Sequence, residues 1–201
     1  MINLKSIAVL GVDGTGKSTI VKAIYEYFGS DKALVQYMGL KEWETWPARI
    51  CTTMPWAKVF GRFVRLAVLY ELKRRVYKHN HRKKIVIFDR YVDEQVLQFC
   101  KTKQNLFGKI MEGLFKRVFW KSFYRPTMSF YMTCNLEVSI ARKDDINSSQ
   151  EIDRLKINKT LMDSFYKKRN DVITIDTTSM PIDETLNIIF KKIEEEKCFN
   201  I

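Results

Sequence analysis

The segment GVDGTGKST, residues 11–19, constrains the fold of this chain more than any other part of its sequence. It matches the phosphate-binding loop pattern G-x-x-x-x-G-K-[ST], whose backbone N–H groups form a concave nest for phosphate oxygens. A lysine in this pattern adds a positive charge for the terminal phosphates, and the hydroxyl after it can bind Mg²⁺. The segment therefore predicts a site for a nucleoside triphosphate. The residues expected to bind it are Gly11, Asp13, Gly14, Thr15, Gly16, Lys17, Ser18 and Thr19.

The sequence around this loop supports the prediction. Residues 6–10, SIAVL, are typical of a short buried strand, and apolar residues recur at helical spacing from Ile20 to Phe28. Gly29 then predicts the end of the helix. A chance glycine-rich turn is the alternative, but a strand, loop and helix in this order favour phosphate binding at a helix N-terminus.

Length and composition predict a single domain over residues 1–201. The chain has 201 residues, of which 46% are hydrophobic, which suits one α/β domain with an ample core. No apolar run is long enough to span a bilayer, and the four cysteines are scattered without a C-x-x-C pair. We therefore expect a soluble cytoplasmic protein with reduced thiols and no structural metal.

The chain is strongly basic, with a formal net charge of +12. An anionic substrate, a nucleic acid or an acidic membrane surface would each account for this charge. The densest basic stretch, residues 73–84, is interpreted as a solvated helix end, so His79 and His81 within it are expected on the surface. No nucleic-acid reading motif accompanies the charge, and no specific nucleic-acid partner is predicted.

Four further β-rich runs, at residues 33–38, 84–89, 128–134 and 172–177, alternate with segments long enough for helices. This alternation predicts a parallel sheet covered by helices on both faces, with ligands at the carboxyl ends of the strands. Residues 106–124 form a basic amphipathic pattern. Packing against the sheet is its first interpretation, with dimerisation or a weak membrane-surface contact as alternatives.

The run from 84 to 89 ends in Asp89 and is followed directly by Arg90. The carboxyl end of this strand should face the same crevice as the phosphate loop. A carboxylate there can orient a metal-bound water or accept a proton, and a guanidinium can hold an acceptor phosphate through two hydrogen bonds. Asp89 and Arg90 are therefore candidate catalytic residues, and Ser18 and Asp89 are candidate Mg²⁺ ligands.

Taken together, these motifs resemble the thymidylate kinases. The resemblance rests on the phosphate loop with Asp13, the sequence DRYVD at residues 89–93, RPTMSFYM at 125–132 and EIDRL at 151–155. It implies a nucleoside monophosphate kinase fold with strand order 2-3-1-4-5 and a small lid at about residues 143–153. It also implies transfer of the γ-phosphoryl group of ATP to a nucleoside monophosphate, with dTMP as the first acceptor, and a homodimer.

Phosphoryl transfer needs a cation on the migrating group. Some thymidylate kinases place an arginine in the phosphate loop, where this chain has Gly14 and Thr15. The resemblance therefore directs the search to the lid, where Arg142 and Arg154 are the first candidates and Lys143 the next. The predicted catalytic set is therefore Lys17, Asp89, Arg90, Arg142 and Arg154.

The chain departs from the family pattern on the acceptor side. Residues 38–42, MGLKE, replace the usual Arg-Glu-Pro sequence, and Glu94 stands where a serine is common. Two alternatives therefore stay open. One is a kinase of the same fold that acts on a non-nucleotide or lipid-linked acceptor, and the other is a nucleotide-gated binding protein.

Overall fold

A computed structural model describes residues 5–39, 44, 49, 61–79, 83–94, 124–143, 148–196 and 199. Its element order is β1 (Ser6–Gly11), α1 (Lys17–Phe28), β2 (Ala33–Tyr37), α3 (Gly61–Tyr77), β3 (Ile85–Asp89), β4 (Met128–Thr133), α6 (Leu136–Ala141), α7 (Ser149–Tyr166), β5 (Ile173–Asp176) and α8 (Ile182–Glu195). The five predicted strands are confirmed, each within about two residues of its expected bounds.

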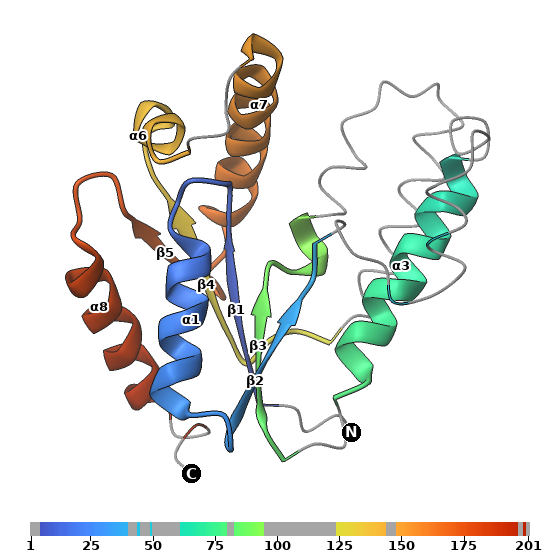
Figure 1. The fold of residues 1–201 in the computed structure, drawn as a ribbon, viewed down its shortest axis with the longest axis vertical. Helices are drawn as coiled ribbons and strands as arrows, with labels where there is room; N and C mark the ends of the chain where they lie inside the picture. Colours follow the sequence, from blue (N-terminus) through green and yellow to red (C-terminus); the bar gives the residue numbers. More distant parts are fainter. Residues whose placement is uncertain are drawn as a thin grey trace.

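The strands form one sheet in the order β2-β3-β1-β4-β5, and every neighbouring pair is parallel. This confirms the α/β fold and the strand order that the resemblance implied. The central strand β1 pairs Val9 with Asp89 of β3 and Gly11 with Met132 of β4. The phosphate loop after β1 therefore lies beside the ends of β3 and β4, as Figure 1 shows for the upper edge of the sheet.

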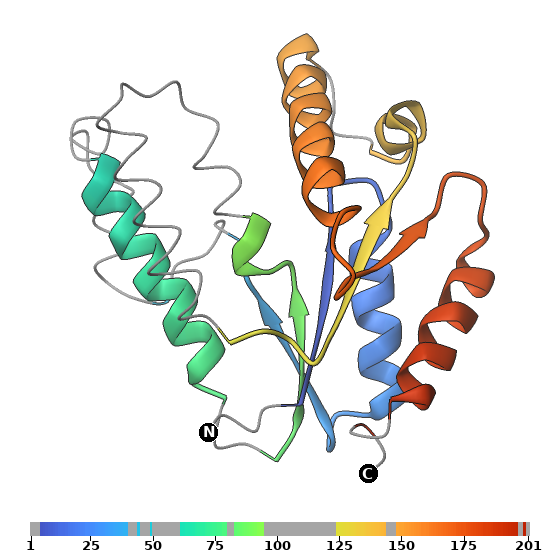
Figure 2. The ribbon, with the colours of Figure 1, turned by 180° about the vertical axis from the view of Figure 1, so that it is seen from behind.

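Helices cover both faces of the sheet because successive strand residues point in opposite directions. In β1, Ile7 and Val9 pack with α1 and α8, whereas Ala8 and Leu10 pack with α3 and α7. The three inner strands, β1, β3 and β4, are buried on both faces, which explains their nearly continuous apolar sequences. Figure 2 shows α1 and α8 side by side, away from α3.

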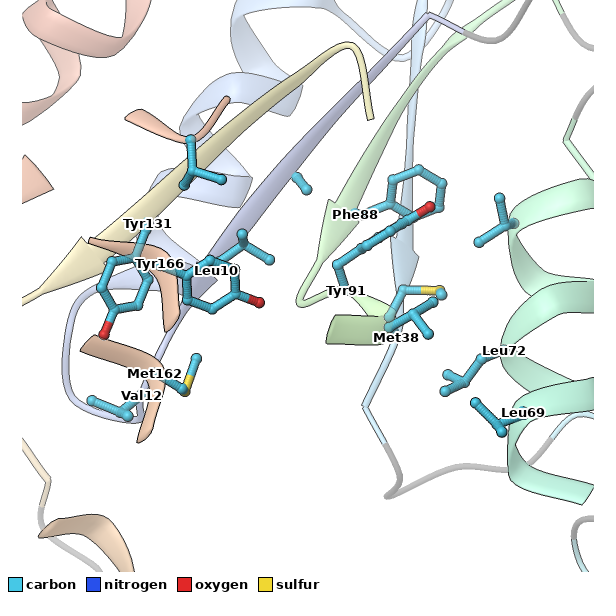
Figure 3. Packing of buried hydrophobic residues seen from close by; sticks show 14 of the residues in the cluster. Leu10, Val12, Met38, Leu69, Leu72, Phe88, Tyr91, Tyr131, Met162 and Tyr166 are labelled. Carbon is cyan, nitrogen blue, oxygen red and sulfur yellow. The ribbon is translucent and has the colours of Figure 1, made fainter. Parts of the chain in front are cut away.

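The core between the sheet and the α3 and α7 helices is rich in aromatic side chains. Tyr131 of β4 and Tyr166 of α7 lie with ring centroids 4.8 Å apart, and Phe88 contacts Tyr91 at 5.2 Å. Figure 3 shows these rings together with Leu69 and Leu72 of α3. This core fixes the ends of β3 and β4, from which the polar residues of the candidate site project.

The expectation that His79 is a surface residue is wrong. Its side chain is buried after the last turn of α3, where the ring Nε2 lies 2.9 Å from the amide oxygen of Gln36 in β2. The helical turn at the end of α3 directs His79 toward the sheet, although many of the residues near it in the sequence are cationic. His81, Cys51, Cys100, Cys198, residues 144–147 of the expected lid and residues 106–123 of the amphipathic pattern lie outside the described residues.

Candidate functional site

The phosphate loop joins β1 to α1 and has the backbone conformation that its glycines predict. Gly11, Gly14 and Gly16 have φ values of 141°, 81° and 85°, a region that side-chain-bearing residues rarely adopt. A Cβ at Gly14 would lie 2.3 Å from the carbonyl oxygen of Ser139 in α6. The Ser139 hydroxyl in turn donates to the carbonyl oxygen of Asp13 at 2.5 Å. Helix α6 therefore packs directly on the loop and fixes its shape.

Lys17 is the first residue of α1, and its side chain is 6% exposed. The ammonium group donates to the carbonyl oxygen of Val12 and lies 3.7 Å from a carboxylate oxygen of Asp13. Burial and then the charge of Arg90 lower the pKa of Lys17 to about 8. Ser18 and Thr19, by contrast, are exposed at the start of the helix. Lys17 thus lies within the loop, and the Ser18 hydroxyl is open to a ligand.

Asp13 brings three cations together at this loop. Its carboxylate accepts a hydrogen bond from Arg90 and lies 3.7 Å from Lys17 and 3.6 Å from Lys143. Burial alone would raise the pKa of Asp13, but the charges of Arg90 and Lys17 outweigh it and lower the pKa to about 2. The carboxylate is therefore ionised. It holds Lys17 at the start of α1, Arg90 directly after β3 and Lys143 just after α6.

Asp89 and Arg90 lie at the carboxyl end of β3, beside the phosphate loop. Burial raises the pKa of Asp89, against the opposing charges of Arg90 and Lys17. Arg90 has a left-handed backbone with a φ of 71°, and its N–H donates to the carbonyl oxygen of Val9 at 3.0 Å. Such strained conformations concentrate at functional sites. The two predicted acceptor-side residues are thus brought together with Asp13 and Lys17.

Two further residues of this edge were absent from the predicted set. Glu94, 2% exposed, accepts hydrogen bonds from the Gly11 N–H at 2.9 Å and from Arg90 at 3.3 Å. Tyr37 ends β2 opposite Asp89, and its phenol is hydrogen-bonded to Arg90. The position of Tyr37 at the end of a predicted strand was a usable signal. Glu94 was visible in the sequence only as a departure from the family pattern.

The two arginines proposed as lid cations have different surroundings. Arg142 directly follows α6 and donates to the carbonyl oxygen of Thr177 at 2.9 Å and to its hydroxyl at 3.3 Å. Thr177 follows β5 and lies 3.4 Å from the carbonyl oxygen of Thr15 in the phosphate loop. Arg154 is exposed near the start of α7. The structure therefore connects Arg142 to the phosphate loop through Thr177, whereas Arg154 lies on the solvent side of α7.

Another cation, Lys159, lies on the inner side of α7. Its ammonium group is 2.5 Å from the carboxylate of Asp163 and 3.4 Å from the hydroxyl of Thr133 at the end of β4. Asp163 also accepts hydrogen bonds from Tyr131 at 2.7 Å and from Thr133 at 3.0 Å. The sequence did not single out Lys159, because the helical spacing of α7 does not by itself show which cation faces the sheet.

The inward side of α3 carries a buried ion pair. Glu71 and Arg75 face the sheet, with 2.9 Å between the guanidinium and the carboxylate, whereas Tyr70 and Arg74 on the same helix are exposed. Arg75 also donates to the carbonyl oxygens of Tyr37 and Gly39, each at 3.1 Å. This buried ion pair fixes the chain directly after β2.

The arrangement has the chemistry for handling a polyphosphate. A glycine nest with a buried lysine receives anions, a carboxylate and a guanidinium stand at the neighbouring strand end, and a hydroxyl opens α1. In the parts of the chain that the structure describes, no group of three or more His, Cys, Asp or Glu side chains forms a metal site. None of the described helices has the length and apolar character needed to cross a bilayer.

Comparison with solved structures shows that this chain has the fold of nucleoside and nucleotide kinases. A deoxyadenosine kinase from M. mycoides with bound dCTP matches with a TM-score of 0.65 and 16% sequence identity, over 95% of this chain and 100% of that one. The same enzyme with bound dATP gives a TM-score of 0.66 at 15% identity, over 94% and 99%. The thymidylate kinase from Candida albicans gives 0.63 at 15% identity, over 98% and 94%. No protein-family model and no curated protein sequence matches the chain.

The fold of this chain is therefore that of the nucleoside monophosphate kinases and their relatives. At 15–16% identity the similarity is one of fold alone.

Proposed function

We propose that this chain is an ATP-dependent phosphotransferase that moves the γ-phosphoryl group of ATP to a nucleoside monophosphate, with dTMP as the first acceptor to test. One observation carries the proposal. The phosphate loop with buried Lys17 lies beside Asp89 and Arg90 at the same edge of the sheet, joined through the contact of Arg90 with Asp13. A donor site and an acceptor site that adjoin in this way suit in-line transfer between two bound ligands.

On the donor side, the loop backbone from Gly11 to Lys17 would hold the phosphates of ATP. Lys17 would leave the Val12 carbonyl and the Asp13 carboxylate, its present neighbours, for the terminal phosphates. The N-terminus of α1 adds its dipole to the same site. Thr177, which contacts both Arg142 and the phosphate loop, lies where the adenine would adjoin the loop after β5.

Mg²⁺ fits the residues at this site. The Ser18 hydroxyl is exposed at the start of α1, and the half-buried Asp89 carboxylate lies within reach of the charge of Lys17. Hydroxyl and carboxylate oxygens suit this ion, which commonly takes only one or two protein ligands beside substrate phosphates and waters. When bound, Mg²⁺ would neutralise charge on the donor phosphates.

On the acceptor side, Arg90 would hold the acceptor and Asp89 would orient it or take its proton. Burial raises the pKa of Asp89 and so makes it a better proton acceptor than an exposed aspartate. Arg142 and Arg154 are the proposed sources of the cation for the migrating group, with Lys143, 3.6 Å from Asp13, as a further candidate. A well-placed arginine contributes about 10³ to 10⁵ in rate in such reactions.

A second candidate acceptor is the hydroxyl group of a deoxynucleoside. The observation that favours it is that Arg90 is bonded to two carboxylates, those of Asp13 and Glu94, with Asp89 adjacent to it. A neutral hydroxyl enters such a group of carboxylates at a lower electrostatic cost than a phosphate dianion does. The likeness in fold to a deoxyadenosine kinase agrees with this alternative.

Coupled release of ADP tests both candidates. The chain is given Mg²⁺, ATP and either a deoxynucleoside monophosphate or a deoxynucleoside, with Lys17→Ala as the control. Acceptor-dependent ADP release that Lys17→Ala abolishes would support the proposal, and preference for monophosphates or for nucleosides would choose between the acceptors. Absence of ADP release with every acceptor would contradict both.

We further propose a cytoplasmic homodimer, as the resemblance to thymidylate kinases implies. Light scattering at micromolar concentration tests the oligomeric state, and a monomer would contradict the proposal. The weak membrane-surface contact proposed from the basic charge is tested by cosedimentation with anionic lipid vesicles, where recovery of the protein in the supernatant would contradict it.

A further inference from the structure

Glu94 is a buried carboxylate placed between the phosphate loop and the acceptor-side arginine. Its side chain is 1% exposed, and its two oxygens have different partners. One accepts the backbone N–H of Gly11 at 2.9 Å, and the other accepts a guanidinium N–H of Arg90 at 3.3 Å. An ionised carboxylate away from water is costly unless it is paired and hydrogen-bonded. Both hydrogen-bond donors to Glu94 belong to the proposed site, and the charge of Lys17 also favours its ionised form.

The partner on the phosphate loop is held rigidly. Gly11 has a φ of 141°, and a Cβ at this position would lie 2.4 Å from the carbonyl oxygen of Met132. The backbone of Gly11 is thus packed closely against β4, and the direction of its N–H is fixed. Glu94 is anchored to this fixed donor at one oxygen, so its other oxygen also has a defined position.

The guanidinium of Arg90 lies between Glu94 and Asp13. These two carboxylates have different surroundings. Asp13 is 43% exposed and is shared with Lys17 at 3.7 Å and Lys143 at 3.6 Å, so bound phosphates would compete with it for its cations. Glu94 lies behind the phosphate loop, away from solvent. Its bond to Arg90 can therefore persist when Asp13 exchanges partners.

We infer that Glu94 is a positioning residue that fixes the Arg90 guanidinium relative to the phosphate loop, so that donor and acceptor keep one relative geometry. The inference rests on the proposed function in placing the acceptor at Arg90. ATP binds through the loop backbone and Lys17, whereas the acceptor depends on the orientation of Arg90. Loss of Glu94 should therefore weaken the use of the acceptor much more than that of ATP.

Glu94→Gln tests this split. Glutamine keeps the size of the side chain and an oxygen for the Gly11 N–H, but it removes the charge that faces Arg90. With the acceptor that the wild-type chain uses best, we expect the acceptor KM to rise about tenfold while the KM for ATP changes less than about twofold. Asp93→Asn is the matched control, because Asp93 is a neighbouring acidic residue whose partner is Arg169, at 2.7 Å. It should leave both KM values within about twofold.

A double-mutant cycle tests whether Glu94 acts through Arg90. If it does, adding Glu94→Gln to Arg90→Lys should raise the acceptor KM by less than a further factor of about two, because the bond is already altered. If the two variants instead multiply each other's effect on the acceptor KM in full, or if Glu94→Gln raises both KM values equally, the inference is overturned. If Glu94→Gln does not fold, Glu94→Asp tests the same bond, because it keeps the charge but draws it back from the guanidinium of Arg90, with the same expected split between the KM values. An unchanged acceptor KM in that variant would overturn the inference.

A measurement without any acceptor separates this inference from the proposed function. Rotation of the Arg90 guanidinium about its Nε–Cζ bond is followed by NMR, with Arg90→Lys used for assignment. We expect slow rotation in the wild-type chain and in Asp93→Asn, and rotation about tenfold faster in Glu94→Gln, since one charged hydrogen bond is lost. Equal rotation rates in all three would overturn the inference. Absence of turnover with a slow, Glu94-dependent rotation would contradict the proposed function alone.

Discussion

The ammonium nitrogen of Lys17 lies 3.7 Å from the Asp13 carboxylate within a single phosphate loop, and burial lowers the pKa of this lysine to about 8. A phosphate ligand prefers the charged ammonium. We therefore expect ATP affinity to be constant below pH 8 and to fall about tenfold for each pH unit above it, as Lys17 loses its proton. Titration calorimetry with ATP between pH 6.5 and 9.5 measures this. Lys17→Arg keeps its charge and should show no such decline. A decline of the same size in that variant would contradict the prediction.

Gly14 and Gly29 provide a matched pair for testing how the phosphate loop is packed. Their φ values, 81° and 79°, are nearly the same, but only at Gly14 would a Cβ meet another atom, the Ser139 carbonyl oxygen at 2.3 Å. Gly29 has a ψ of 156°, in a region that essentially only glycine adopts, so we expect Gly29→Ala to lower the free energy of unfolding by about 1–3 kcal/mol through backbone strain alone. Gly14→Ala should cost clearly more and should also weaken ATP binding. Urea denaturation and calorimetry test this, and equal losses of stability would contradict the packing of α6 on the loop.

The buried pair of Glu71 and Arg75 should contribute strongly to stability. Glu71 is fully buried and Arg75 is 2% exposed, and Glu71 also accepts the backbone N–H of Glu44 at 2.7 Å. Removing one partner of such a pair leaves a buried charge poorly compensated. We expect Glu71→Gln to lower the free energy of unfolding by about 3 kcal/mol in urea denaturation.

The exposed pair of Lys22 and Glu26, 3.7 Å apart on α1, is the control for this prediction. Solvent screens it, so Glu26→Gln should change the free energy of unfolding by less than about 0.5 kcal/mol. Similar losses of unfolding free energy in Glu71→Gln and Glu26→Gln would contradict the prediction, because the buried pair would then stabilise the fold no more than the exposed pair does.

Arg142 and Arg154 can be separated by kinetics. Arg142 is directed to Thr177 beside the phosphate loop, whereas Arg154 is exposed on α7. We expect Arg142→Ala to lower kcat by about 10³, in the range of an arginine that acts on the migrating phosphoryl group, and Arg154→Ala to lower it less. Single-turnover phosphoryl transfer measures the step itself. Lys156→Ala, which removes another exposed cation of α7, is the control. A larger loss for Arg154→Ala would instead assign the role to that residue.

Local sequence patterns predicted the strands well because each strand is short, apolar and bounded by clear breaks. The glycine spacing of the phosphate loop likewise predicted its conformation, since only glycine adopts these φ values readily. Contacts between side chains from distant parts of the chain were harder to predict. His79 was expected at the surface because its neighbours are charged, yet the turn of α3 places it against Gln36, 43 positions away in the chain. In the sequence, Glu94 was visible only as a departure from the family pattern. Its contact with Gly11 is what shows that it belongs to the site.

The sequence alone was enough to predict the phosphate loop, the alternating strands and helices, and the presence of Asp89 and Arg90 at a strand end. These features depend on residue type and short-range spacing, which act within a few residues of the chain. The folded structure was needed to show that Asp13 contacts Arg90, Lys17 and Lys143, and that Glu94 lies behind the loop. Those contacts join residues up to 130 positions apart (13 to 143), and the parallel order of β3, β1 and β4 brings them to one edge.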